Sequence, residues 1–311
     1  MIVEISNTTV SKISRSLIQL REQGGAVALG RVLTLVIQTD PENAERAIDA
    51  ANGASREHPS RIIVLIDSPQ QAEARLDAEI RVGGDAGASE VIILKPYGAA
   101  AGYPQSLVMG LLLPDAPVVA WWPGSAPTVL SQSPIGKIAT RRITDAASQA
   151  NPTAFLGALA KSYAPGDSDF AWTRLTLWRA QLAAILDQPP YEPVTSVELI
   201  GDLANPSVVL LAAWLRLQLK CEVSTKHRPD SLGVKAVYLV RLHRADSAIE
   251  VLRDQSDIAV LSQTNQPPKE LSLPVRSLRD CLAEDLRRLD PDLAFEKVVV
   301  EGLELLNQDM E

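Results

Sequence analysis

Strand-like apolar runs on either side of a helix-like segment near the N-terminus constrain the fold more than any other feature of the sequence. Residues 29–37 are rich in valine and leucine, with Arg31 as their only charge, which is typical of a buried strand. Asp40 and Pro41 then supply the cap and first turn of a helix, and residues 61–67 form a second apolar run. A strand, a helix and a strand at this spacing predict a right-handed crossover in a parallel sheet.

Composition places the chain among globular proteins with room for two domains. Of its 311 residues, 46% are hydrophobic and 22% are charged. The 38 acidic and 30 basic residues give a net charge of −8, which argues against nucleic acid or an anionic membrane as the main partner. The N-terminus lacks the pattern of an export signal, and the apolar run that starts at Val208 is broken by Arg216. We therefore expect a cytoplasmic protein.

The second half of the chain repeats the alternation of strands and helices. Residues 196–200, 206–219 and 222–226 predict a strand, a helix and a strand. Three further β runs, separated by short turns, predict an antiparallel meander: 234–243, 248–253 and 258–263. Two helices are expected to close the chain.

A helical segment is predicted between these halves. Residues 152–163 and 169–187 have helical spacing, and Pro189-Pro190 marks the linker that follows. We predict an α/β protein of two lobes joined by this helical connector: an N-terminal lobe with a mostly parallel or mixed sheet (1–150), the connector (151–190), and a C-terminal lobe with a mixed sheet and the meander (191–311).

A glycine-rich segment, Arg81-Val-Gly-Gly-Asp-Ala-Gly-Ala-Ser-Glu90, is a candidate anion-binding loop or protein contact. It lies between an alternating run, 74–82, and an apolar run, 91–94, so it joins two strands. A dinucleotide fingerprint would instead lead into a helix whose N-terminus holds the pyrophosphate. The candidate residues in this loop are Arg81, Gly83, Gly84 and Asp85.

No catalytic or metal-binding pattern rises above background. The histidines at 58, 227 and 243 are dispersed, there is no Gly-x-Ser-x-Gly elbow, and Cys221 and Cys281 form no Cys-x-x-Cys motif. We expect no catalytic residues, no metal and no cofactor, and we interpret the two cysteines as plain thiols.

Arginines and tryptophans supply the remaining candidates for binding a partner or an anion. The turn before the second strand carries Arg56, His58 and Arg61, which could reach an acidic group or a phosphate, or could simply form a solvated, capped turn. In an extended segment Trp121 and Trp122 would point to opposite faces, so one is expected in the core and the other exposed.

Arg174 and Trp178 lie one turn apart on a predicted helix. Arginine and tryptophan are enriched in interface hot spots, although core packing is the more common role of tryptophan.

Several stretches together resemble the OpcA family, the glucose-6-phosphate dehydrogenase assembly proteins. The likeness spans nearly the whole chain and is densest from about Gly24 to Pro190; no single motif is diagnostic, but the ordered set is specific. The matching stretches are 24–33, 54–61, the glycine-rich segment 81–90, Leu113-Pro-Asp-Ala-Pro-Val-Val-Ala-Trp-Trp-Pro-Gly124, Arg141-Arg-Ile-Thr-Asp145 and 165–179.

The resemblance implies a non-catalytic protein that binds glucose-6-phosphate dehydrogenase in the pentose phosphate pathway and promotes its assembly or activity. It carries over no catalytic residues, and in some members thiol redox state is part of the regulation. The alternative function is a sugar-phosphate or nucleotide sensor, or an enzyme, in which Arg56, Arg61, Arg81 and the glycine loop hold an anion.

Overall fold

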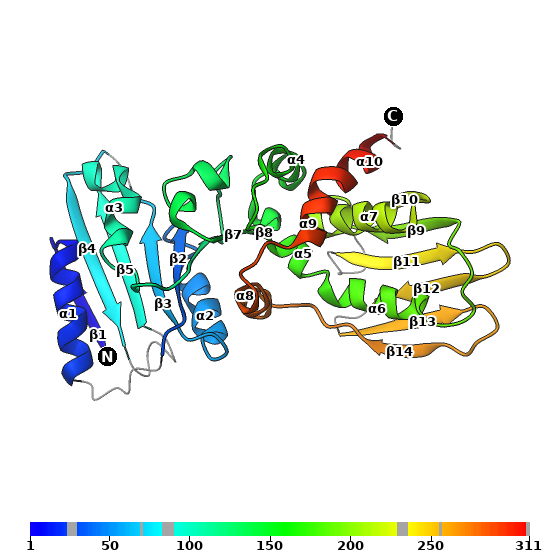
Figure 1. Cartoon of the computed structure of the whole chain (residues 1–311), viewed down its shortest axis with the longest axis horizontal. Helices are drawn as coiled ribbons and strands as arrows, with labels where there is room; N and C mark the ends of the chain where they lie inside the picture. The colour runs from blue at the N-terminus through cyan, green and yellow to red at the C-terminus, as the bar shows by residue number, and fades with distance from the viewer. Residues whose placement is uncertain (24–29, 69–70, 83–89, 229–235, 255–256, 309–311) are drawn as a thin grey trace. The chain divides into compact units, whose positions relative to one another are not determined.

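The computed structural model describes residues 1–23, 30–68, 71–82, 90–228, 236–254 and 257–308 (Figure 1). The chain forms two compact units, each built from three segments. Unit 1 comprises Met1–Ser148, Ala164–Ser168 and Ser277–Pro291, and unit 2 comprises Gln149–Tyr163, Asp169–Arg276 and Asp292–Glu311. The units are thus discontinuous along the sequence, whereas contiguous boundaries near 150 and 190 are the expectation from sequence.

Unit 1 is organised around an eight-stranded mixed sheet, in agreement with the predicted N-terminal lobe. Its central strands β5, β3, β2, β6 and β7 are parallel neighbours, while at one edge β4 pairs antiparallel with β5 and β1 pairs antiparallel with β4. The order across the sheet is β1 (Ile2–Ile5), β4 (Arg75–Arg81), β5 (Glu90–Tyr97), β3 (Ser60–Ile66), β2 (Leu33–Thr39), β6 (Val118–Trp122), β7 (Arg141–Thr144) and β8 (Asp167–Asp169).

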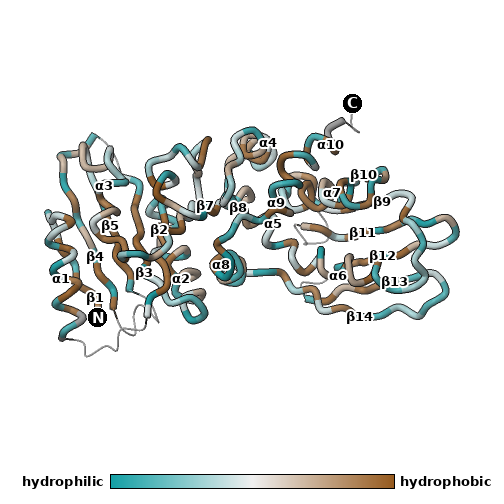
Figure 2. Tube along the Cα trace, in the orientation of Figure 1, coloured by the Kyte–Doolittle hydropathy of each residue, from teal (hydrophilic) through white to brown (hydrophobic). Residues whose placement is uncertain are grey.

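The predicted crossover, strand 29–37, helix and strand 61–67, corresponds to β2, α2 and β3. Every residue of β3 is buried, as is all of β2 except Gln38, because strands at the centre of a parallel sheet are covered on both faces. In Figure 2 the middle of both strands has hydrophobic colour. The helices of unit 1 are α1 (Val10–Gln23), α2 (Ala44–Ala54), α3 (Pro104–Met109) and α8 (Leu278–Arg287), with short 3-10 turns at Gly98–Gly102, Leu130–Gln132, Gly136–Ile138 and Ala146–Ser148.

Unit 2 contains the predicted second crossover and meander in one six-stranded sheet. Strand β9 pairs parallel with β10, and the remaining neighbours are antiparallel. The order is β10 (Glu222–His227), β9 (Ser196–Gly201), β11 (Val237–His243), β12 (Ala248–Leu252), β13 (Ile258–Gln263) and β14 (Lys269–Ser272). The prediction of a mixed sheet with an antiparallel meander is confirmed.

Helices of unit 2 include α7, which contacts β9 and β10 and whose apolar residues are buried almost all round. The helix predicted over 169–187 is broken into α5 and α6 at Arg174 and Leu175. A π-helical turn lies inside the last helical segment, where a Cβ on Gly302 would come 3.1 Å from the Ala213 carbonyl oxygen of α7, so glycine permits this close approach. The elements are α4 (Pro152–Ser162), α5 (Phe170–Thr173), α6 (Thr176–Leu186), α7 (Pro206–Leu219), α9 (Leu293–Lys297), η7 (Val298–Gly302) and α10 (Leu303–Gln308).

No helix in the described part of the chain is long and apolar enough to cross a membrane.

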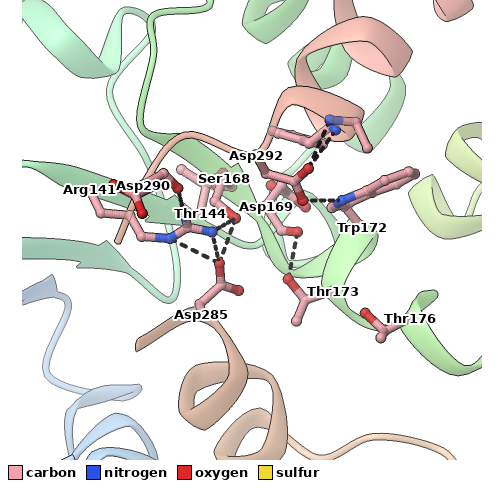
Figure 3. A network of polar contacts seen from close by, with 12 residues as sticks. Arg141, Thr144, Ser168, Asp169, Trp172, Thr173, Thr176, Asp285, Asp290 and Asp292 are labelled. Atoms are coloured by element: carbon pink, nitrogen blue, oxygen red, sulfur yellow. Dashed lines mark hydrogen bonds and ion pairs between the residues drawn. The ribbon is translucent and has the colours of Figure 1, made fainter. Parts of the chain in front are cut away.

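Two adjacent buried arginines on β7 hold together the segments of unit 1. Arg141 forms an ion pair with Asp285 of α8, donates to Ser168 Oγ at 3.1 Å and donates to the Asp290 carbonyl at 3.1 Å (Figure 3). Arg142 forms an ion pair with Asp167 and donates to the Pro165 carbonyl at 2.6 Å. These contacts connect β7 to residues that follow it by 23 to 149 positions.

In unit 2, the Trp172 indole nitrogen donates to Asp292 Oδ2 at 2.8 Å, as Figure 3 also shows. Asp292 at the same time caps α9 by accepting from the backbone nitrogens of Ala294 and Phe295. The Trp172 ring lies 5.9 Å from the ring of Phe295, so one carboxylate and one aromatic contact fix the start of the last helical segment.

Replacing Asp285 by alanine would leave the buried Arg141 guanidinium without its carboxylate. We expect Asp285→Ala to lower the free energy of unfolding by about 3–5 kcal/mol, measured by urea denaturation. Arg287→Ala on the same helix removes only an exposed contact to Glu57 at 3.5 Å and should cost about 1 kcal/mol or less. Equal, small losses in the two variants would contradict a structural role for the Arg141–Asp285 pair.

Candidate protein-binding face

The turn that carries Arg56, His58 and Arg61 places these side chains in different environments. Arg56 is exposed and follows α2, whereas Arg61 is 7% exposed. The Arg61 guanidinium contacts Glu90 Oε2 at 2.9 Å and donates to the Leu111 carbonyl at 2.5 Å. His58 is half-buried, and its Nε2 has no hydrogen-bond partner among the described residues. Arg61 is therefore held inside unit 1 by an acidic group of its own chain.

Arg81 is likewise held by carboxylates. It contacts Glu45 through two nitrogens at 2.6 and 2.8 Å and Glu79 at 2.7 Å. The hydrogen bonds to Glu45 are the main reason why the pKa of Arg81 is raised, and they lower the pKa of Glu45. Gly83, Gly84 and Asp85 lie outside the described residues, so their part in a loop stays a prediction.

Trp121 and Trp122 are both buried, at 0% and 1% exposure. The expectation that one of them would be exposed is wrong, because β6 lies inside the sheet between β2 and β7 and both of its faces are covered. The Trp122 indole nitrogen donates to Gln38 Oε1 at 3.2 Å. Burial also matches the more common, core-packing role that the sequence suggested for most of the tryptophans.

Arg174 lies at the break between α5 and α6, and Trp178 lies in the first turn of α6. Trp178 is 2% exposed, and the Arg253 guanidinium lies 5.3 Å from the centre of its ring. Arg174 and Trp178 both line one cavity of unit 2. Of the candidate residues predicted from the sequence, Arg174 and Trp178 are the pair that the structure places at one cavity.

The point where the strand order of unit 1 reverses is occupied by acidic side chains. In doubly wound sheets ligands bind at this point, beyond the carboxyl ends of the strands on either side of the reversal, here β2 and β6. Asp40 follows β2, and its carboxylate accepts from the Asn43 backbone nitrogen at 2.9 Å. Because Asn43 is the N-cap residue of α2, this carboxylate lies where a phosphate would contact the N-terminus of the helix. Hydrogen bonds from Asn43 are the largest cause of the lowered pKa of Asp40.

Asp67 adds a second carboxylate at the same ends of the strands. It follows β3 and accepts from Gln38 Nε2 at 3.1 Å, and burial together with the charge of Asp40 raises its pKa. Carboxylates repel phosphate, so the carboxyl ends of β2 and β3 disfavour a dinucleotide. A glycine-rich loop at the same place would favour one. The described residues also contain no group of three or more His, Cys, Asp or Glu side chains that could hold a metal ion.

The most extended candidate for binding a protein is one face of the six-stranded sheet, which we call the open face. Its central row is charged: Arg241 of β11 contacts Glu198 of β9 at 2.6 Å and Glu250 of β12 at 2.6 Å. Lys226 of β10 contacts Glu198 at 2.5 Å, and this hydrogen bond is the main cause of the lowered pKa of Glu198. A hollow of about 430 Å³ lies over these side chains.

An apolar row runs beside the charged one. It consists of residues that the strand register places side by side across four strands: Ile200, Leu239, Leu252 and Val260. Ile200, Leu252 and Val260 are half-exposed. Three half-exposed aliphatic side chains beside a charged row offer both the apolar area and the polar groups that protein interfaces contain.

The sequence contained a signal for this face, but only within single strands. The alternation in 248–252 and 258–263 predicts one buried and one wet face for each strand. Which residues of neighbouring strands become partners depends on register, and Glu198 and Arg241 are 43 positions apart.

Two family models match this chain over most of its length. Residues 51–161 match the glucose-6-phosphate dehydrogenase subunit N-terminal domain, and residues 165–299 match the C-terminal domain of the same subunit. The chain belongs to the OpcA family. The resemblance seen in its sequence is thereby confirmed, and a comparison with curated proteins found no match.

Solved structures similar to this OpcA-family chain include oxidoreductases. An oxidoreductase from Sinorhizobium meliloti has a TM-score of 0.50 and 9% identity, with 88% of this chain and 95% of that chain covered. Levoglucosan dehydrogenase in complex with NADH and L-sorbose has a TM-score of 0.48 and 9% identity, covering 89% and 95%. At this identity the likeness to the first of them concerns the fold alone.

The acidic side chains beyond β2 and β3 predict that the protein does not bind a dinucleotide. We expect a titration of the purified chain into NADH to leave the fluorescence of the cofactor unchanged up to millimolar protein, because Asp40 and Asp67 repel the pyrophosphate. Saturable binding of NADH that is lost in Asp40→Glu, where the carboxylate side chain is longer, would contradict this interpretation of the site.

Proposed function

We propose that this chain is a non-catalytic assembly factor that binds glucose-6-phosphate dehydrogenase and promotes its active oligomer. The observation that supports this most directly is the match of both family domains, which together run from residue 51 to residue 299 and are described as domains of a subunit of that dehydrogenase. The protein then acts through contacts with the enzyme and supplies no reacting group.

The arrangement of charges in unit 1 agrees with a role without catalysis. The strands β2 and β3 are followed by Asp40 and Asp67, whose carboxylates disfavour a dinucleotide at this end of the sheet. Of the three arginines that the sequence suggested for an anion in unit 1, Arg61 and Arg81 are held by Glu90 and Glu45, and Arg56 is exposed. The chain therefore combines a doubly wound type of sheet with arginines that are paired with carboxylates of the same chain.

Promotion of an active oligomer requires different affinities for the states of the dehydrogenase. A factor that binds two states equally well shifts nothing, however tight the binding. A coupling free energy of about 1–3 kcal/mol is typical and would change the affinity of the dehydrogenase for its substrate by roughly fivefold to 150-fold.

The open face of unit 2 is the surface we assign to the dehydrogenase. Its half-exposed row of Ile200, Leu252 and Val260 supplies apolar area, and the neighbouring row of Lys226, Glu198, Arg241 and Glu250 supplies paired charges that can fix orientation. Lys226 has a side chain that is 64% exposed, so its contact with Glu198 can be exchanged for a partner's carboxylate at low cost.

The general test mixes the purified chain with the dehydrogenase from the same cell and follows co-elution and substrate saturation. We expect a complex on size-exclusion chromatography and a lower KM or a higher kcat of the dehydrogenase. A dehydrogenase that neither co-elutes nor changes its kinetics would refute the assembly role, and turnover of a sugar phosphate by the isolated chain would refute the non-catalytic one.

A specific prediction concerns Val260, which lies in the apolar row. Val260→Arg places a charge where apolar area would be buried, and we expect it to weaken the complex at least tenfold, measured by surface plasmon resonance. Leu293→Arg is the matched control, because Leu293 is 68% exposed in unit 2 and does not lie on the open face. Equal losses of affinity in the two variants, or a loss only in Leu293→Arg, would remove the open face as the contact surface.

A further inference from the structure

Unit 2 contains a cavity of about 200 Å³ whose lining is rich in arginine. It lies where α5 meets α6, at the N-terminus of α7, at the start of β11 and just after β12 and β14. The lining residues with polar or aromatic side chains are Arg174, Trp178, Asn205, Ser207, Arg253 and Arg276. None of the described lining residues is acidic, and three of them are arginines.

Arg253 is the decisive residue because it is buried without a carboxylate. The residue is 4% exposed, its guanidinium donates to the Val237 carbonyl at 3.3 Å, and its Nε is buried with no partner in the described part of the chain. Burial lowers the pKa of Arg253, but an arginine remains charged in proteins. An unpaired buried cation costs free energy, which a bound anion would recover.

The N-terminus of α7 adds positive potential to the same cavity. Asn205 caps this 14-residue helix by accepting from the Ser207 backbone nitrogen at 2.9 Å, and both residues line the cavity. The dipole of this helix favours an anion near its N-terminus. Arg276 also lines the cavity, and its guanidinium donates to the Thr173 carbonyl at 3.2 Å, which holds the side chain in place.

The volume of the cavity limits what it can hold. About 200 Å³ is smaller than the cavities that take drug-sized ligands, roughly 300–1,000 Å³, and far too small for a dinucleotide. It suits a phosphate group with a short carbon skeleton, and the Trp178 ring offers an apolar surface against which the skeleton of a sugar can pack.

We propose that this cavity binds the phosphate group of a small phosphate monoester, of the sugar-phosphate class, with Arg253, Arg174 and Arg276 as its guanidinium ligands. The anion site thus lies in unit 2, whereas the sequence suggested Arg56, Arg61, Arg81 and the glycine loop in the N-terminal lobe. The site does not depend on the proposed assembly function, because a ligand can bind the isolated chain.

The test measures binding of inorganic phosphate, glucose 6-phosphate and glucose to the isolated full-length chain by calorimetry. We expect glucose 6-phosphate to bind best, phosphate to bind more weakly and glucose to show no binding. Both anions should raise the Tm of the chain, since they bind only the folded state.

Arg253→Met keeps an apolar stem of similar length and removes the charge. We expect affinity for both anions to fall at least tenfold, while the Tm without ligand stays equal or rises, because an unpaired buried charge is removed. Arg244→Met is the matched control: Arg244 is also buried and lies in the turn between β11 and β12, at the opposite end of these strands. It should leave anion affinity unchanged.

Several results would overturn the proposal. They are the absence of phosphate binding to the unaltered chain, equal affinity in Arg253→Met, or equal losses in Arg253→Met and Arg244→Met. A phosphate-free acidic peptide that binds in place of the anions, with the same dependence on Arg253, would also overturn it. If Arg253→Met lowers the Tm, Arg276→Met is measured instead, with the same expected loss of anion affinity. None of these measurements involves the dehydrogenase, so failure here is distinct from failure of the assembly role.

Discussion

Burial of two neighbouring arginines on β7 is the constraint on which the construction of unit 1 depends. A buried guanidinium without a carboxylate would cost several kcal/mol, so Arg141 and Arg142 must be paired within the folded unit. Asp285 and Asp167 are their partners, and both come from segments far along the chain. The pairs explain why residues 164–168 and 277–291 belong to unit 1 although most of unit 2 separates them in the sequence.

The same rule distinguishes structural charges from those that remain available to ligands or partners. Arg61 and Arg81 are held by Glu90 and Glu45, which makes them part of the scaffold. Arg253 is buried against Trp178 without a carboxylate, and this is the arrangement expected where an anion completes the site. On the open face, Arg241 is paired but partly exposed. The charged row can therefore orient a bound protein without a large free-energy cost of removing water from its charges.

The sheet of unit 1 has the strand order of nucleotide-binding folds but not the residues that bind a phosphate. The parallel order β5, β3, β2, β6 and β7 is that of a doubly wound nucleotide-binding sheet, and a solved oxidoreductase shares the overall fold at a TM-score of 0.50. The residue that follows β2 is Asp40 in place of a glycine, and its carboxylate uses the backbone donor that a phosphate would need. In this chain the end of the sheet where such folds bind nucleotides is occupied by the protein's own side chains.

The sequence by itself determined most of the secondary structure, the class of both sheets and the family. Periods of 2 and 3.6 residues are local properties, so β2, α2, β3 and the meander of β11 to β13 could be predicted from them. The break at Arg174, the burial of both Trp121 and Trp122, and the discontinuous segments of unit 1 were decided only by tertiary structure. So were the partners of Arg61 and Arg141, the apolar row of the open face and the arginine-lined cavity, because each depends on register and packing between residues distant in the chain.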